Sequence, residues 1–215
     1  MEDSNTRDKI LKKVRKALIN KSTHDTGHVD FDSPVYVQSA DPMEMQFAQK
    51  FSSLNGKFVF CENEKEFTDN VSVLIKDNNW TNVFCLEPSL KDLLQKEKIE
   101  FSDKAAELAN ANIGITTCEC LIARTGSVMI SSRQASGRRL PLYSNIHIVA
   151  AYTSQLVPDI KDGLKLIKTK YSEIPSLIGN ITGPSRTADI EKTLVQGAHG
   201  PKEIFVFLID DSSKY

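Results

Sequence analysis

The sequence predicts an α/β protein built on a mainly parallel or mixed sheet that is covered on both faces. Along most of its 215 residues, segments with apolar residues at helical spacing alternate with short segments that are almost entirely apolar. Such short runs are typical of strands buried on both faces of a sheet. The last run, "EIFVFLI" at 203–209, has six apolar residues in seven and is therefore predicted to be an internal strand.

Residues 1–40 are predicted to form a helix and a linker that precede an α/β domain at 41–215. Apolar and basic side chains within residues 7–20 recur on opposite helical faces. The apolar positions are Ile10, Leu11, Val14 and Leu18, and the basic positions are Lys12, Lys13, Arg15 and Lys16. This amphipathic helix is expected to pack on the domain or on a partner subunit. Membrane-surface binding is the alternative, although the helix is short and has no aromatic anchor.

Within the domain, the spacing of apolar residues assigns each element in turn. The first half is predicted to contain helices at 47–54, 67–75 and 88–94 and strands at 57–61 and 82–86. The second half is predicted to contain strands at 111–117, 126–132, 145–152, 176–182 and 203–209 and helices at 160–171 and 187–195. Because no long helix separates the strands within 113–150, an antiparallel or mixed portion of sheet is expected there.

Composition excludes several classes of protein. With 40% hydrophobic and 26% charged residues, the chain can bury a normal core, and its formal charge of -1 predicts no broad attraction to nucleic acid or to a membrane surface. No apolar run approaches the ~20 residues of a membrane span. The N-terminus lacks the apolar core of a signal peptide, so a cytoplasmic location is expected.

The four cysteines predict neither a disulfide framework nor a metal site. Cys61 and Cys85 each close an apolar run and are expected to be buried thiols at strand ends. Cys118 and Cys120 form an isolated C-x-C, which provides too few ligands for a zinc or iron–sulfur site. No metal, cluster or other cofactor is therefore predicted.

Two segments with polar chemistry precede or follow predicted strands, where α/β proteins often bind ligands. In Thr125-Gly126-Ser127, the glycine permits an unusual backbone angle and the hydroxyls are able to donate to an oxyanion, although an ordinary tight turn explains the same residues. The second segment is a loop that contains several arginines, including Arg138, ahead of the strand that carries His147. Arginine suits carboxylate or phosphate, but a solvated basic loop explains the same residues equally well. A lone histidine on a strand is more often a hydrogen-bonded structural residue than a catalyst, although its pKa range keeps the second role open.

The third segment, residues 183–200, holds more glycine and polar residues than its predicted elements require. A helix near Ser185, capped by Ser185 or Thr187 and with Asp189 and Glu191 in its first turn, explains part of it. Together with Thr125–Ser127, its two turns are expected to form one wall of a pocket for a small anion. The candidate ligand-binding residues are Thr125, Gly126, Ser127, Arg138, His147, Gly183, Pro184, Ser185, Arg186, Thr187, Gly197, His199 and Gly200.

Residues 105–210 contain four distinctive segments in order, "GITTCECLIARTGSVMI", "HIVAAYTSQLVPDI", "GPSRTADIE" and "VQGAHGPKEIFVFLI". Together these segments resemble the LUD-domain family of lactate utilisation proteins. The resemblance implies a three-layer α/β fold similar to the NagB/RpiA/CoA-transferase group. It also implies a place in a three-protein complex that oxidises L-lactate to pyruvate, in which sister subunits supply the Fe–S cysteines. One departure is Arg124, which stands where the family often has an acid.

Two other functions stay open on the residues alone. The chain could be an independent enzyme that handles acyl groups or phosphate, as fold relatives suggest by analogy. It could also be a non-catalytic interaction module that needs no pocket. Neighbouring genes for Fe–S proteins would favour the complex subunit, whereas turnover by the isolated chain would favour the independent enzyme.

The cysteine pattern generates a direct prediction. We expect the purified chain to contain no stoichiometric iron or zinc, because its only close thiol pair lacks further ligands at suitable spacing. Elemental analysis of the purified protein measures this. Stoichiometric metal that disappears in a Cys118→Ser/Cys120→Ser variant would contradict the prediction.

Overall fold

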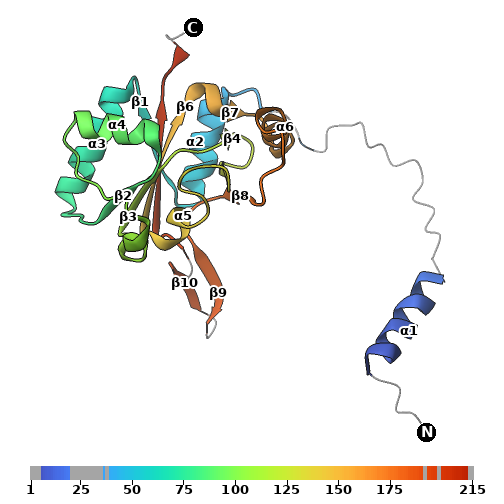
Figure 1. Cartoon of the computed structure of the whole chain (residues 1–215). Helices are drawn as coiled ribbons and strands as arrows, with labels where there is room; N and C mark the ends of the chain where they lie inside the picture. Colours follow the sequence, from blue (N-terminus) through green and yellow to red (C-terminus); the bar gives the residue numbers. More distant parts are fainter. Residues whose placement is uncertain (1–5, 20–35, 37–38, 191–192, 198–199, 213–215) are drawn as a thin grey trace. The chain divides into compact units, whose positions relative to one another are not determined.

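The structure is a computed structural model that describes residues 6–19, 36, 39–190, 193–197 and 200–212 (Figure 1). The chain divides into two units, Met1–Ser39 and Ala40–Tyr215. In the first unit, α1 spans Thr6–Ile19, as the amphipathic pattern predicted. The second unit contains all of the strands that the structure describes.

The second unit is organised around a parallel five-stranded sheet with the order β1-β11-β6-β3-β2. Its strands are β1 (Lys57–Cys61), β2 (Val83–Cys85), β3 (Ile113–Thr116), β6 (Ile146–Tyr152) and β11 (Glu203–Ile209). The C-terminal strand β11 lies between β1 and β6, so the prediction of an internal strand is confirmed. Cys61 and Cys85 end β1 and β2 as buried free thiols, also as predicted.

Helices α3 (Glu64–Asp77) and α4 (Pro88–Lys96) cover one face of this sheet. The helix α3 begins where the Asn63 side chain accepts a hydrogen bond from the Glu66 amide at 2.9 Å, a typical N-cap. Its Phe67 ring contacts Phe207 of β11 edge to face, with centroids 5.4 Å apart. Apolar side chains of both helices and of alternate strand positions thus form one core cluster.

A second sheet covers the opposite face, with the order β7-β4-β5-β8. Its strands are β4 (Cys120–Ile122), β5 (Ser127–Ser131), β7 (Leu156–Val157) and β8 (Ile178–Ile181). The β4–β5 and β5–β8 pairs are antiparallel, which confirms the mixed portion expected within 113–150. Helix α2 (Met43–Ser53) packs beside it through Phe47 and Phe51, and α6 (Ile160–Lys170) covers its outer face through Ile167.

Three further short helices lie in the described part of the second unit. They are η1 (Ala105–Asn110), α5 (Leu140–Tyr143) and η2 (Thr153–Gln155). Gly114 of β3 permits α5 to approach the main sheet, because a Cβ at that position would lie 2.9 Å from the Ser144 hydroxyl and 3.0 Å from Leu140. No helix among the described residues is long and apolar enough to cross a membrane.

The helix predicted at 187–195 is wrong. The segment forms an antiparallel hairpin of β9 (Arg186–Ile190) and β10 (Thr193–Gln196), which extends beyond the sheets in Figure 1. Ser185 and Thr187 therefore cap no helix and Asp189 occupies no first helical turn, while Glu191 lies outside the described residues. The segment is rich in β-branched residues, which favour strands once a pairing partner is available.

His147 is fully buried, and it points away from α3 and α4, because its neighbours Ile146 and Ile148 pack in the cluster with those helices. Its Nε2 lies 2.8 Å from the Thr116 hydroxyl on the neighbouring strand, whereas its Nδ1 has no hydrogen-bond partner among the described residues. Burial lowers the pKa of His147 to about 4 because the interior disfavours the charged imidazolium. Its burial and its contact with Thr116 favour the structural interpretation of this histidine.

The buried histidine predicts an acid-sensitive fold. A folded-state pKa below the unfolded value means that the unfolded chain binds the proton more tightly, so stability falls as the pH falls through that interval. From pH 7.5 to pH 5, the free energy of unfolding should fall by about 2 kcal/mol more in the native protein than in His147→Gln. Urea denaturation across this range measures the difference. Identical pH dependence in both proteins would contradict the assignment.

Candidate functional site

The carboxyl ends of parallel strands are the usual ligand-binding edge of an α/β sheet, and an arginine loop lies there in this protein. The loop, residues 132–139, connects β5 to α5 and borders a cavity of about 690 Å³. Leu86, which directly follows β2, forms part of the cavity wall. The charged and polar side chains that line it are Ser132, Arg133, Ser136, Arg138, Arg139, Glu173 and Ser176.

The buried carboxylate of Glu87 holds the far end of this loop. One of its oxygens accepts hydrogen bonds from the Ser136 hydroxyl at 2.6 Å and from the Ser136 amide at 3.1 Å. Both residues are buried, and Glu87 follows the carboxyl end of β2 by two positions. A buried carboxylate is costly unless it is hydrogen-bonded, so this contact fixes the loop to the end of β2.

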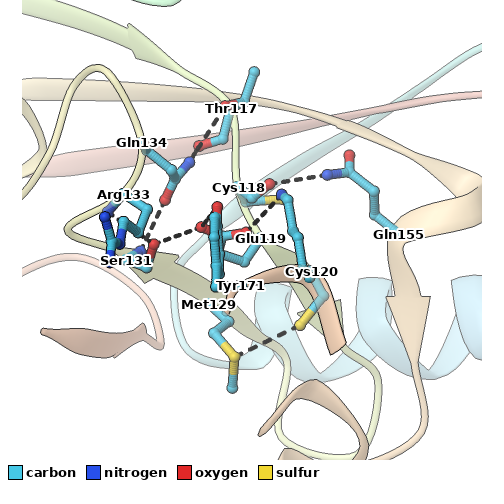
Figure 2. Close-up of polar contacts among 11 residues, drawn as sticks. Thr117, Cys118, Glu119, Cys120, Met129, Ser131, Arg133, Gln134, Gln155 and Tyr171 are labelled. Carbon is cyan, nitrogen blue, oxygen red and sulfur yellow. Dashed lines mark hydrogen bonds and ion pairs between the residues drawn. The ribbon is translucent and has the colours of Figure 1, made fainter. Parts of the chain in front are cut away.

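A second buried carboxylate, Glu119, holds the start of the loop (Figure 2). It accepts hydrogen bonds from the Ser131 hydroxyl at 2.5 Å and the Tyr171 hydroxyl at 2.8 Å, and it pairs with the Lys170 ammonium at 2.8 Å. Burial acts to raise the pKa of Glu119, but these three donors outweigh it and lower the pKa below its usual value. The carboxylate is therefore ionised and fully engaged.

Gln134 completes the attachment of the loop to the end of β3. Its side-chain oxygen accepts from the Ser131 amide, and its nitrogen donates to the Thr117 carbonyl, each at 2.9 Å (Figure 2). The Arg133 amide also donates to the Ser131 hydroxyl at 3.1 Å. The loop backbone is thus organised by its own protein contacts and needs no ligand to hold its shape.

The three arginines differ in how they are engaged. Arg133 forms an exposed ion pair with Glu173 at 3.3 Å. Arg138 and Arg139 are exposed and, within the part of the chain that the structure describes, neither forms an ion pair. The charged residues that line the cavity, three arginines and one glutamate, give it a formal charge of +2. Planar guanidinium groups at such a site suit carboxylate or phosphate.

The predicted Thr125-Gly126-Ser127 segment forms a tight turn. Gly126 has φ +59°, and a Cβ there would lie 2.6 Å from the Phe51 amide nitrogen at the end of α2. Ser127 donates to the Thr125 hydroxyl and contacts the Thr182 hydroxyl, each at 2.8 Å. The hydroxyls thus satisfy one another, which favours the structural interpretation of this turn.

The structure brings the second predicted turn, Gly183–Arg186, next to the first. Gly183 has φ +104° and packs on Leu54, whose carbonyl also accepts a 2.9 Å hydrogen bond from the Arg186 guanidinium. Pro184 lies within this turn and Thr187 within β9. Because Leu54 precedes β1, these turns lie at the amino end of that strand, whereas Arg138 borders the cavity at the carboxyl end of β2.

The third turn meets the second at the base of the hairpin. The Gly197 amide donates to the Ser185 carbonyl at 2.9 Å, and the Ser185 amide donates to the Pro201 carbonyl at 2.8 Å. Gly200 packs directly on Ser185. His199 lies outside the described residues. The candidate residues therefore fall into a group of adjoining turns, the separate arginine loop with Arg138, and the buried His147.

Arg124, the departure from the family pattern, has a structural partner. Its guanidinium pairs with both carboxylate oxygens of Asp159, at 2.9 and 2.8 Å, and Asp159 accepts from the Ile160 amide at the start of α6. The hydrogen bond from Arg124 is the main cause that lowers the pKa of Asp159. The pair links β4 to α6 and lies outside the arginine loop.

Cys118 and Cys120 do not act as a pair. Cys118 packs in the cluster between the two sheets, whereas Cys120 packs on the opposite side of the second sheet with Met129 and Ile167. Burial raises the pKa of both thiols, that of Cys120 to about 12, which disfavours the thiolate that metals bind. Among the described residues, no three His, Cys, Asp or Glu side chains are grouped as metal ligands.

Sequence reasoning missed the two anchoring carboxylates. Glu87 and Glu119 each follow a strand of the main sheet. The partner of Glu87 lies 49 positions away along the chain, and the partners of Glu119 lie between 12 and 52 positions away. Their position after strands is the only sequence signal that could have marked them.

Comparison with known proteins gives the same family as the sequence motifs. Lactate utilization protein C of Bacillus licheniformis is 38% identical over 104 residues, which cover 47% of this chain and 43% of the relative. The Bacillus subtilis protein of that name is 36% identical over 118 residues, covering 54% and 48%. The chain thus spans about half the length of these curated relatives. The Geobacillus kaustophilus protein of the same name is 27% identical over 192 residues, covering 86% and 74%.

A solved structure has the same fold. It is the crystal structure of a DUF162 family protein from Deinococcus radiodurans, which has a TM-score of 0.59 and 18% identity and covers 78% of this chain and 96% of that one. The LUD domain family model matches residues 44–209, which contain the main sheet, the second sheet and the arginine loop. The chain therefore belongs to the LUD-domain family.

Proposed function

We propose that this chain is a lactate utilisation protein of the LutC type and a subunit of an assembly that oxidises L-lactate to pyruvate. The observation that carries the proposal is the similarity to several proteins named Lactate utilization protein C. In this role, Fe–S sister subunits would accept the electrons of the oxidation. The four free and buried cysteines are compatible with a cytoplasmic location, where thiols stay reduced.

We further propose that the arginine loop binds the small anion of this system. L-Lactate and pyruvate are both carboxylates at neutral pH, and a guanidinium binds a carboxylate through two parallel hydrogen bonds. Arg138 and Arg139 would contact the anion, because Arg133 is already paired with Glu173. The anchored backbone supports this assignment, since a loop that is ordered before binding loses less entropy when the ligand arrives.

The size of the cavity supports a second candidate function, that of an independent enzyme with a larger ligand. About 690 Å³ lies within the range of roughly 300–1,000 Å³ found for drug-sized ligands and exceeds what a three-carbon acid fills. An independent enzyme acting on a larger acyl or phosphate ligand would use the same arginines. A binding comparison of lactate, pyruvate and inorganic phosphate separates these candidates by preference.

The arginine loop generates a binding prediction. Loss of a charge-assisted hydrogen bond costs about 1.5–3 kcal/mol, so Arg138→Ala and Arg139→Ala should each weaken carboxylate binding about tenfold or more. Isothermal titration with lactate and pyruvate measures the affinity. Arg186→Ala is the matched control, because it removes the same charge from the turn beside Leu54 and should leave the affinity unchanged.

The control also tests the alternative site. If Arg186→Ala weakens binding while the loop variants do not, the anion binds at the glycine turns rather than at the arginine loop.

Growth of the native host on L-lactate tests the wider function. A strain that lacks this chain should fail to grow on lactate, and normal growth of that strain would refute the lactate assignment.

A further inference from the structure

We infer that the cavity beside the arginine loop selects an amphipathic anion, a carboxylate or phosphate that carries an apolar body larger than the methyl group of lactate. The inference rests on the anion site proposed above and concerns the part of the ligand that the arginines do not contact. Three aliphatic side chains, Leu86, Leu108 and Ile174, line the cavity together with the charged residues. A wall of both kinds suits a ligand that is itself partly charged and partly apolar.

The aliphatic part of the wall comes from three segments that are distant along the chain. Leu86 follows β2, Leu108 lies in η1, and Ile174 lies between α6 and β8. Leu108 is buried in a small core cluster, and Leu86 packs against that cluster. Because side chains that are packed in a core keep their positions, this part of the wall is formed before a ligand binds.

Ile174 is held at the cavity by the contacts of its neighbours. Its side chain is 67% exposed, the highest fraction among the large hydrophobic residues that the structure describes. Directly before it, Glu173 pairs with Arg133 of the arginine loop at 3.3 Å. Two positions after it, the Ser176 hydroxyl donates to the Ser132 hydroxyl at 3.0 Å. These contacts fix an aliphatic side chain beside the loop, where covering it with apolar surface is favourable.

The volume of the cavity leaves room for an apolar body. A three-carbon acid that contacts Arg138 and Arg139 does not fill about 690 Å³. Each CH₂ group of a longer ligand that is buried against the aliphatic wall strengthens binding about fourfold. Single exposed aliphatic residues are common on protein surfaces, whereas here three aliphatic residues share one cavity with three arginines. The arrangement therefore favours a branched or long side chain and supports the second candidate function.

Isothermal titration of the full chain with pyruvate and with 4-methyl-2-oxopentanoate tests the inference. The two acids share the 2-oxo carboxylate group and differ only in the side chain, so the ratio of their affinities reports the apolar contact. The longer acid should bind about tenfold more tightly, as partial burial of its additional carbons requires. Ile174→Ala should reduce this ratio to below about threefold, because it removes most of one aliphatic side chain from the wall.

Leu164→Ala is the matched control. Leu164 is an exposed aliphatic residue of α6 that does not line the cavity, so its replacement should leave the affinity ratio unchanged. A second pair of ligands, butyl phosphate and inorganic phosphate, identifies the anionic group. If only this pair shows a preference for the longer ligand, and Ile174→Ala removes it, the apolar contact is supported with phosphate as the charged group.

Failure of this inference and failure of the proposed anion site give different results. Equal affinity for the short and the long member of both pairs, with binding that still requires Arg138, would overturn the apolar contact and leave the anion site intact. A preference for the longer ligands that Ile174→Ala does not change would also overturn it. Absence of binding by all of these anions would refute the anion site, and the inference with it.

Discussion

The burial of β11 on both faces is the constraint on which the rest of the second unit depends. Phe205 and Phe207 of this internal strand pack toward α3 and α4, whereas Val206 and Leu208 pack toward α2 and the second sheet. A strand with two apolar faces requires a cover on each side. The second sheet provides one of these covers, and because its outer face is also apolar, it requires α6 in turn.

This arrangement of layers positions the arginine loop. The loop continues from β5 of the second sheet and reaches the carboxyl ends of β2 and β3. Glu87 accepts hydrogen bonds from Ser136 of the loop, and Glu119 accepts one from Ser131, which ends β5 directly before the loop. Burial of two carboxylates is unfavourable unless donors compensate for the lost water. The same contacts that compensate Glu87 and Glu119 order the loop backbone and leave Arg138 and Arg139 exposed beside the cavity.

The two ends of the main sheet carry different kinds of turn. At the amino end, Gly126 and Gly183 adopt positive φ angles, which permits them to pack closely on the end of α2. The nearby polar groups form hydrogen bonds mainly with one another and with the backbone. At the carboxyl end, the loop presents charged groups to solvent. A close-packed turn and a ligand site both use glycine and hydroxyl residues, so residue type alone does not distinguish them.

The sequence by itself determined the main strands, the helices α2, α3, α4 and α6, and the internal position of β11, because apolar periodicity directly reflects burial. It also marked Arg138 as a candidate for anion binding. The hairpin at 186–196, the very short strands β4 and β7, and the anchoring roles of Glu87 and Glu119 were decided only by the tertiary structure. Each depends on partners distant along the chain, and local propensity carries no information about contacts that form only when the layers assemble.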